Sequence, residues 1–264
     1  MSPSVLKKPM SSPRRIGKRL YESRYLYLLL ALPVIYFVIF KYGAMMWLTI
    51  AFKKYNAIQG IWGSKWVGFK QFEKFITDPY FWNVVKNTIV LNLEMLLCYF
   101  PAPIILALMI NEVKRKRFQK FTQSITYLPY FLSTVIVCGF IKDITASDGL
   151  INMLRGLFGA ESIPFMSEAQ YFRTIYILSE LWQQTGWGSI IYLAALTGVD
   201  SQLYEAASID GASKWRQLIS ISLPSIAPVI SIQFLLTVGR LLNVGYEKII
   251  LLYNGSTYAT ADVI

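Results

Sequence analysis

The sequence predicts an all-α integral membrane protein, and three observations support this fold class. Hydrophobic residues make up 55% of the 264-residue chain, against about 45–50% in a typical soluble domain. Charged residues make up only 16%, and the mean hydropathy is +0.43. The apolar residues are gathered into long runs separated by polar stretches, so we expect the chain to cross a bilayer several times.

Five apolar runs are close to the length of a transmembrane helix, since about 20 residues cross the hydrocarbon core. The predicted spans lie at about 25–52, 84–110, 124–141, 174–197 and 229–252. The first run follows a basic tail at 1–24 but is too long for the apolar core of a signal peptide. We therefore expect an uncleaved first helix and a transmembrane domain over 25–264. Pro101 and Pro103 predict a kink in the second span, which neighbouring helices can accommodate.

The distribution of positive charge predicts the orientation in the membrane. The N-terminal tail, the loop at 111–123 and the segment at 198–228 share one side and carry 14 Lys and Arg, against 8 on the other side. Because the side richer in Lys and Arg faces the cytoplasm, the N-terminus and segment 198–228 are predicted to be cytoplasmic. The net charge of +11 is thereby explained by topology and contact with membrane lipid, and we expect no nucleic-acid partner.

The composition also excludes several kinds of chemistry. The chain has no histidine, which removes histidine-based acid–base catalysis, Ser-His-Asp triads and HExxH zinc sites. Cys98 and Cys138 lie in apolar runs without a CxxC pair, so we expect free core cysteines. A GxxxxGK[ST] loop for ATP phosphates is also missing. We therefore expect a chain without enzymatic activity that binds no metal or cofactor itself.

Segment 198–228 contains the most informative stretch of the sequence. Asp200 or Ser201 is placed to cap a short helix, and Gly211 permits the turn that ends it. Ala207 and Gly211 are four residues apart and share one helical face. That face is small and smooth, so another protein can approach it closely. We expect a short cytoplasmic helix between two spans that presents a docking face.

The spacing in this segment resembles the cytoplasmic signature of ABC importer permeases. The signature consists of Glu-Ala-Ala, three residues, Gly, nine residues and Ile-x-Leu-Pro. Here it reads Glu205-Ala206-Ala207, Gly211 and Ile221-Ser222-Leu223-Pro224. The resemblance implies that this segment couples the chain to an ATPase. The residues to which it assigns that role are Tyr204, Glu205, Ala206, Ala207, Asp210, Gly211, Ile221, Leu223 and Pro224.

Other stretches resemble the membrane subunits of carbohydrate importers of the type I (maltose-type) group. These are WVGFKQFEKFITDPYFWNVVKNT at 66–88, PAPIILALMINE at 101–112, YLPYFLSTVIV at 127–137, GLINMLRGLFG at 149–159 and GYEKIILLYN at 245–254. The resemblance implies a type I ABC importer permease fold and uptake of oligosaccharides or polysaccharide fragments. Members of this branch have about six spans, so a sixth helix is expected after Ile264.

The resemblance also implies a set of partners. A second homologous permease completes the pore, which makes a heterodimer the expected arrangement. Two ABC ATPase subunits bind on the cytoplasmic side and use ATP and Mg, while an extracytoplasmic solute-binding protein delivers the oligosaccharide. The permease itself is a non-catalytic subunit of the bacterial cell (inner or plasma) membrane.

Polar and aromatic residues within the spans are the candidates for the sugar path. Polar residues are costly in hydrocarbon and often line a pathway, and sugars stack on aromatic rings. Glu94, the deepest acid in its span, is the first candidate. For Trp182 and Trp187 the alternative is an interfacial aromatic belt, and for Glu180 it is the outer membrane boundary. For Arg240 the alternative is a structural ion pair with Glu247, seven residues away on the same face. The full set of predicted pathway residues is Glu94, Trp182, Gln183, Gln184, Trp187, Arg240 and Asn243.

Three other functions compete with carbohydrate import. A type I ABC permease for phosphate, an amino acid or a metal chelate would carry the same coupling segment. A secondary transporter or channel would have no use for that segment, and no inverted repeat is evident to support it. A membrane enzyme would need a nucleophile or metal cluster that the sequence does not offer. The sequence favours carbohydrate import, with the non-sugar ABC permease as the alternative.

Overall fold

The computed structural model describes residues 22–240 and 245–263. The basic tail up to residue 21 lies outside these ranges, as does the predicted pathway residue Asn243. Backbone contacts divide the chain into two compact units, Met1–Asp78 and Pro79–Ile264.

The first unit begins with a long apolar helix, Arg24–Phe52. Its most apolar stretch has a mean hydropathy of 2.0, and none of that stretch is buried against the chain. A helix that is apolar on all sides without protein around it is typical of a span that faces lipid. Within Arg24–Phe52 the α-helical segments α2 (Arg24–Tyr36) and α3 (Gly43–Met45) are joined by a π-helical stretch, and a 3-10 stretch completes the helix.

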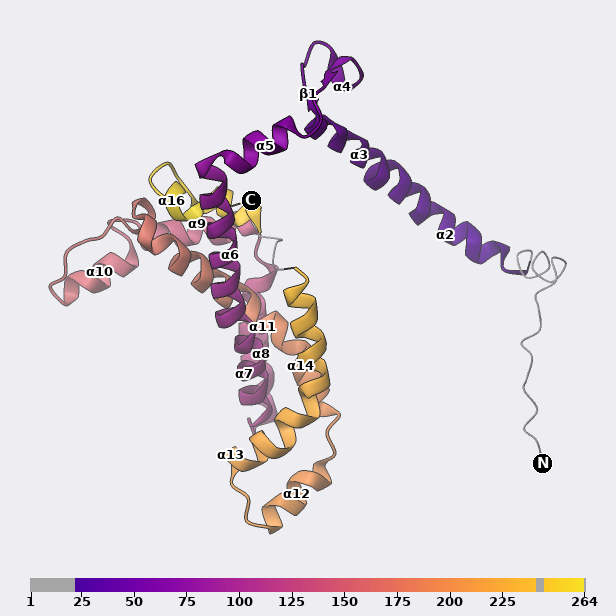
Figure 1. The fold of residues 1–264 in the computed structure, drawn as a ribbon. Coiled ribbons are helices and arrows are strands. Elements are labelled where there is room, and N and C mark those ends of the chain that lie inside the picture. Colours follow the sequence, from indigo (N-terminus) through magenta and orange to yellow (C-terminus); the bar gives the residue numbers. More distant parts are fainter. Residues whose placement is uncertain (1–21, 241–244, 264) are drawn as a thin grey trace. The chain divides into compact units, whose positions relative to one another are not determined.

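A small hairpin follows this helix (Figure 1). Its strands pair antiparallel, with Lys53 opposite Trp66. The elements of this part are β1 (Lys53–Lys54), α4 (Gly60–Gly63), β2 (Lys65–Trp66) and α5 (Lys70–Thr77). The hairpin is a local exception to the all-α prediction, which holds for the rest of the described chain.

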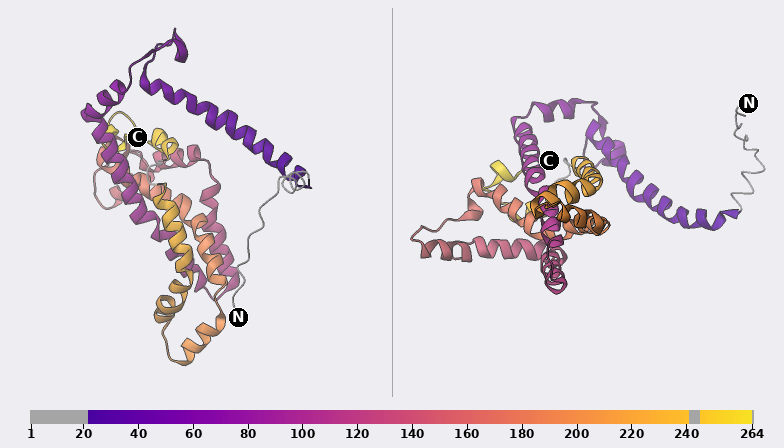
Figure 2. Two further views of the ribbon diagram at one scale, coloured as in Figure 1. Left: turned by 45° about the vertical axis from the view of Figure 1, so that its right-hand side comes forward. Right: turned by 90° about the horizontal axis from the view of Figure 1, so that it is seen from below.

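The second unit is built from helices. Figure 1 and the left view of Figure 2 both show α12 at one end of this unit and α16 at the other. Its elements are α6 (Pro79–Tyr99), α7 (Pro101–Asn111), α8 (Lys116–Tyr127), η3 (Leu128–Phe131), α9 (Thr134–Thr145), α10 (Leu150–Leu157), η4 (Phe165–Ser167), α11 (Ala169–Thr197), α12 (Ser201–Ile209), α13 (Lys214–Gln217), η5 (Leu218–Ser222), α14 (Leu223–Val238), α15 (Tyr246–Leu252) and α16 (Tyr258–Ala261).

α11 is the central helix of the second unit and packs against α6, α7, α8, α14 and α16. Most of its buried residues recur every three or four positions and therefore form one stripe along the helix, which Ile177 and Tyr192 widen. The stripe comprises Phe172, Tyr176, Ser179, Gln183, Gly186, Ser189, Leu193 and Leu196. Because other helices cover this stripe, α11 can carry more polar residues than a helix surrounded by lipid.

Two clusters of buried apolar residues pack at opposite ends of α11. The first joins it to α6, α9, α15 and α16, and the second joins it to α7 and α14. The first cluster consists of Leu91, Val137, Cys138, Ile141, Phe172, Tyr176, Ile177, Ile249, Leu252 and Ala261. The second consists of Ile104, Ala107, Leu108, Ile110, Tyr192, Leu193, Leu196 and Ile226. Cys138 is thus a free core cysteine as predicted, whereas Cys98 is free but exposed.

Several helices of the described residues are long and apolar enough to cross a membrane. They are Arg24–Phe52, Pro79–Asn111 and Lys214–Val238, and the pair Lys116–Phe131 and Thr134–Leu157, bent by 99°, is a fourth candidate. α11 lies at the predicted fourth span and, with 29 residues, has the length to cross. The chain is therefore a multi-pass helical membrane protein.

The helices differ in their bounds from the predicted spans. The run at 124–141 contains the bend between η3 and α9, where Leu132 and Ser133 have extended backbone, and Pro129 lies in the 3-10 turn just before it. The last apolar helix begins at Lys214, well before the predicted start of the fifth span, and α15 is a separate short helix. The sequence interpretation placed the entry to this span after two prolines, yet Pro228 lies inside α14. A proline removes one backbone hydrogen bond without ending a membrane helix.

Pro101 and Pro103 coincide with a break in the second apolar run. α6 ends at Tyr99 and α7 begins at Pro101, where the missing N–H of proline costs little because the first turn of a helix lacks partners anyway. The two helices together still form a candidate span of 33 residues.

Gly186 provides a test of the packing around α11. A Cβ at this position would overlap the backbone carbonyl of Thr126 and lie 3.1 Å from the amide nitrogen of Tyr127. Backbone atoms cannot rotate aside as a side chain can, so Gly186→Ala should lower the thermal midpoint of the detergent-solubilised protein by several degrees. Fluorescence-detected size-exclusion chromatography after heating measures this midpoint.

Gly139→Ala is the matched control, because a Cβ on Gly139 meets nothing within 4 Å. This variant should keep the parental midpoint. An unchanged midpoint for Gly186→Ala would contradict the close packing of α11 on the end of α8.

Candidate functional site

Helix α12 is stabilised locally at both ends. The Asp200 carboxylate caps its first turn by accepting a hydrogen bond from the Gln202 amide at 2.9 Å. At the other end Gly211 has a φ of +75°, and the amide of Ala212 donates to the carbonyl of Ala207 at 2.8 Å. This is the Schellman arrangement with glycine in the left-handed position. The predicted cap and the predicted turn are both confirmed, with Asp200 as the capping residue.

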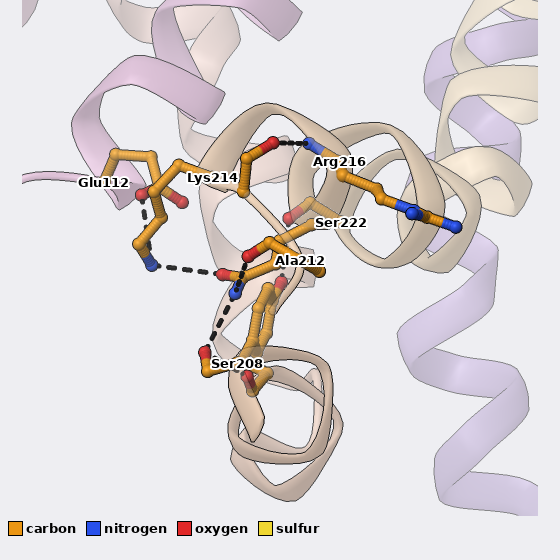
Figure 3. A network of polar contacts seen from close by, with 9 residues as sticks. Glu112, Ser208, Ala212, Lys214, Arg216 and Ser222 are labelled. Atoms are coloured by element: carbon orange, nitrogen blue, oxygen red, sulfur yellow. Dashed lines mark hydrogen bonds and ion pairs between the residues drawn. The ribbon is translucent and has the colours of Figure 1, made fainter. Parts of the chain in front are cut away.

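Side-chain hydrogen bonds hold α12 against the helical segment that leads into α14 (Figure 3). The Tyr204 hydroxyl lies 2.9 Å from the Ser222 hydroxyl. The Gln217 amide nitrogen donates to the Ser208 hydroxyl at 2.9 Å and to the Ala212 carbonyl at 3.2 Å. Gln217 and Ser222 are buried, so these bonds are protected from water. One face of α12 is therefore joined to the beginning of the last apolar helix.

An ion pair extends this contact to the end of α7. The Lys214 ammonium lies 3.6 Å from the Glu112 carboxylate and donates to the Gln217 side-chain oxygen at 3.2 Å. Figure 3 shows Glu112 and Lys214 facing one another. Lys214 is largely exposed, so the pair contributes little to stability, although it adds a contact between α7 and α13.

The predicted coupling residues divide between the two faces of this segment. Tyr204, Ala207 and Ile221 are half-buried on the inner face, whereas the other residues predicted for coupling are exposed. Ala207 is thus partly covered, although the sequence placed it on the docking face. The exposed residues are Glu205, Ala206, Asp210, Gly211, Leu223 and Pro224.

Two apolar residues on the outer face of α12 were missed by sequence reasoning. Leu203 is 51% exposed and Ile209 is 87% exposed. The sequence contained a signal for them, because a helix predicted to lie in the cytoplasm, outside membrane and core, has no local reason to carry an exposed leucine and isoleucine. With Ala206 they give α12 an apolar outer surface beside the acidic Glu205.

Two neighbouring clefts lie along the helices of the second unit. The first, of about 330 Å³, is lined by Leu91, Asn92, Met95, Leu96, Tyr99, Tyr176, Glu180, Gln233, Leu236, Thr237, Arg240 and Gly245. The second, of about 550 Å³, is lined by Tyr99, Phe100, Pro103, Trp187, Gly188, Ile190, Ile191, Tyr192, Gln233, Thr237 and Arg240. The clefts share Tyr99 from α6 and three polar residues of α14 and its end.

Of the three shared residues, Gln233 and Thr237 lie in α14 and Arg240 lies in the turn just after it. Gln233, Thr237 and Arg240 follow one another at intervals of four and three residues, which is the spacing of a single helical face. Sequence reasoning identified Arg240 but missed Gln233, Thr237 and Tyr99. Gln233 stands alone in an otherwise apolar run, and this isolated amide was the signal that could have found the face.

Two of the predicted pathway residues line the clefts. Arg240 contributes to both, and Trp187 contributes to the second. The Trp187 ring also stacks on Tyr130, with ring centres 4.5 Å apart and planes 5° from parallel. This contact holds the indole in one orientation at the cleft wall.

The remaining described candidates do not line these clefts. Glu94 lies 3.9 Å from the Arg173 guanidinium, which also donates to the Asn87 side-chain oxygen at 2.9 Å. Trp182 is 47% exposed and stacks on Phe140. Gln184 is half-buried on α11, and Gln183 belongs to an interior network.

The interior network joins α11 to α15 around a buried lysine. The Lys248 ammonium is 2.5 Å from the Glu180 carboxylate and donates to the Gln183 side-chain oxygen at 2.8 Å. The Gln183 amide nitrogen in turn donates to the Leu132 carbonyl at 3.1 Å. Lys248 is 3% exposed, and sequence reasoning did not identify it. Glu180 therefore reaches from the first cleft into the interior.

Comparison with known proteins identifies the class of membrane protein to which this fold belongs. The chain is a membrane permease with the fold of type I ABC importer permeases. Residues 100–246, which include the predicted coupling residues, match the family described as "Binding-protein-dependent transport system inner membrane component". The chain belongs to this family. The predicted resemblance and the predicted fold class are confirmed.

Two relatives from Bacillus subtilis (strain 168) are similar over most of the chain. The polygalacturonan/rhamnogalacturonan transport system permease protein YteP is 44% identical over 95% of this chain and 78% of its own length. Protein LplB is 40% identical over 92% of this chain and 77% of its own length. The similarity therefore extends well beyond the family signature.

A solved structure shows the same fold. The crystal structure of a bacterial ABC transporter involved in the import of the acidic polysaccharide alginate contains a chain that matches with a TM-score of 0.87 and 40% identity. The match covers 94% of this chain and 84% of the other.

The Glu180–Lys248 pair provides a second test. Removing one partner of a buried ion pair leaves a charge without compensation and costs about 3–5 kcal/mol. Lys248→Met should therefore lower the thermal midpoint strongly. The double variant Glu180→Gln/Lys248→Met should recover part of the loss, because neither side chain is then charged, and a double-mutant cycle measures the coupling.

Glu112→Gln/Lys214→Met serves as the control, since this pair is more exposed and should change the midpoint little. Additive effects of the Glu180 and Lys248 substitutions would contradict the interior ion pair.

Proposed function

We propose that the chain is the transmembrane permease subunit of an ATP-driven ABC importer for oligosaccharides or polysaccharide fragments, and that it forms half of the translocation pore. The relatives named for polygalacturonan and rhamnogalacturonan transport and for alginate import support this substrate class. The observation that carries the proposal is the continuous helix Lys214–Val238. It is joined to α12 at its beginning and contributes Gln233 and Thr237 to both clefts.

The helix Lys214–Val238 gives a physical route from the ATPase to the solute path. Because Tyr204 and Gln217 join α12 to the first turns of this helix, a displacement of α12 also displaces the helix. The cleft residues Gln233 and Thr237 then move relative to Tyr99 on α6. Closure of an ATPase dimer beneath α12 would in this way change the access to the clefts.

The exposed part of the coupling segment is proposed to bind the ATPase. Leu203, Ala206 and Ile209 form an apolar contact, and Glu205 pairs with a basic or amide donor of the ATPase. Gly211 permits close approach at the turn. ATP and Mg bind to the ATPase subunit, so the permease acts without catalysis of its own.

The proposed assembly contains a second homologous permease, two ABC ATPase subunits and an extracytoplasmic solute-binding protein. A related transporter has been solved in complex with an alginate pentasaccharide-bound periplasmic protein, which supports the last partner. The orientation proposed from the charge distribution places the N-terminus and α12 in the cytoplasm of a bacterial cell. The clefts of this chain would face those of the partner permease.

The sugar path is proposed to follow the two clefts. The Gln233 amide, the Asn92 amide and the Tyr99 hydroxyl offer hydrogen bonds to sugar hydroxyls, and the Trp187 ring offers a stacking surface. Arg240 and Trp187 are the predicted pathway residues that we place against the sugar. Gln183 supports the wall through Lys248 instead.

Reconstitution of the complete complex tests this function. The chain, its partner permease, the ATPase and the binding protein are assembled in proteoliposomes, and ATP hydrolysis is measured with a panel of oligosaccharides. We expect hydrolysis to rise only when the binding protein carries a saccharide. A complex that responds to phosphate, amino acids or metal chelates but to no saccharide would instead establish the non-sugar permease.

Gly211 tests the coupling segment. A residue other than glycine at φ +75° is strained, and a glutamate adds charge at the turn, so Gly211→Glu should abolish stimulated ATP hydrolysis without lowering the level of the protein in the membrane. Gly211→Asn is the matched control, because asparagine tolerates the left-handed conformation, and it should keep most of the stimulation.

Ile209→Asp separates docking from the shape of the turn, since Ile209 is exposed and lies before it. This variant should fold normally but fail to retain the ATPase during purification. Ile58→Asp, at an equally exposed isoleucine outside α12, should retain it. Normal ATPase retention and stimulation in both Ile209→Asp and Gly211→Glu would refute the coupling role of α12.

A further inference from the structure

The two clefts are lined by few charged side chains, and these differ in whether a partner of opposite charge compensates them. The acidic and basic side chains among the lining residues are Glu180, which lines the first cleft, and Arg240, which lines both. All other lining residues are apolar, aromatic, amide, hydroxyl or glycine. The electrostatic character of the path along this chain therefore depends on these two residues.

The negative charge of Glu180 is compensated within the chain. Its carboxylate lies 2.5 Å from the ammonium of Lys248, and Lys248 is 3% exposed. A cation held this close in the interior offsets the carboxylate more strongly than a surface cation could, because little water screens the pair. Glu180 consequently adds little net negative potential to the cleft.

Arg240 is different because its charge has no such partner. Its side chain is exposed, and it forms no ion pair with a carboxylate in the ranges 22–240 and 245–263. An arginine in a protein does not lose its proton. The shared wall of the two clefts therefore carries one uncompensated positive charge.

The position of Arg240 makes this charge available to a solute that passes from one cleft to the other. Arg240 lies in the turn directly after α14, where its amide donates to the Thr237 carbonyl at 3.0 Å, and its side chain lines both clefts. Seven residues of helix span about 10 Å, so the guanidinium and the amide of Gln233 can contact different parts of one extended solute. Tyr99 faces the same space from α6.

We propose that the saccharide carried by this importer bears carboxylate groups, and that Arg240 is the residue of this chain that selects them. The inference rests on the proposed function, because it concerns the same clefts. The planar guanidinium binds a carboxylate through two parallel hydrogen bonds, while Gln233 and Tyr99 bind hydroxyls. A neutral saccharide would cover Arg240 without pairing its charge, and burial of an unpaired charge is unfavourable.

Matched pairs of saccharides test the proposal in proteoliposomes that contain the complete complex. The probes are trisaccharides of galacturonate, glucuronate and mannuronate, each compared with the same trisaccharide after reduction of its carboxyl groups. The initial rate of uptake is measured below saturation. The same binding protein is used throughout, so any difference between permease variants arises in the membrane subunits.

We expect the parental complex to import at least one oligouronate faster than its reduced counterpart. Arg240→Gln should lower the uptake of that oligouronate about tenfold or more, the usual loss when a charge-assisted hydrogen bond is removed. Arg240→Lys should keep more of the oligouronate uptake rate, because lysine retains the positive charge although it lacks the paired N–H donors of the guanidinium. Arg117→Gln removes an exposed arginine outside the clefts and should match the parental protein.

The outcomes distinguish a failure of carboxylate selection by Arg240 from a failure of the oligosaccharide-import function. Import of reduced saccharides alone would overturn the carboxylate selection and leave the oligosaccharide importer intact. The role of Arg240 would also be overturned if Arg240→Gln lowered the uptake rates of an oligouronate and its reduced counterpart equally. It would be overturned as well if this variant lowered neither rate. If no saccharide is imported and none stimulates ATP hydrolysis, the proposed function itself fails. Co-purification of the ATPase and the partner permease with each variant shows that the complex has assembled.

Discussion

The close approach of α11 to its neighbours is the constraint on which the second unit depends. At Gly186 the helix lies directly on the backbone at the end of α8, and a covered stripe of side chains runs along most of its length. This stripe contains Ser179, Gln183 and Ser189, which would be costly in contact with lipid. Because α11 shields them, they can supply hydrogen bonds inside the unit, and the helices around α11 can present apolar surfaces to the membrane.

Polar contacts within the second unit join two different pairs of helical segments. The hydrogen bonds between α12 and the segment before α14 are arranged at one end, where Tyr204 meets Ser222 and Ser208 meets Gln217. The Glu180–Lys248–Gln183 network holds α15 against α11 in the interior. Between these two networks lies α14, which has a single buried residue, Ile226. A helix joined firmly at its beginning and packed lightly along its length is suited to transmit a displacement.

Sequence reasoning succeeded where the signal is local. The Asp200 cap, the left-handed turn at Gly211 and the all-helical fold follow from hydrogen bonding and hydrophobicity over a few residues. Sequence reasoning was less successful for features that depend on contacts between helices. The bend between η3 and α9 and the early start of the last apolar helix were not predicted, because tertiary packing decides whether a proline ends a membrane helix. Nor could the sequence tell that Glu94 and Trp182 do not line the two clefts, because the packing of distant helices decides which side chains face a cleft.

Composition and hydrophobic patterning determined that this protein is a helical membrane protein, and the spacing at residues 204–224 resembles the signature of ABC importer permeases. The tertiary structure decided which polar residues meet. Gln183 and Lys248 are separated by 65 positions yet share a buried hydrogen bond, and Arg240 is left without a carboxylate partner in the described part of the chain while Glu180 has one. The burial of a charge and the identity of its partner depend on how distant helices pack, and no local pattern of residues contains that information.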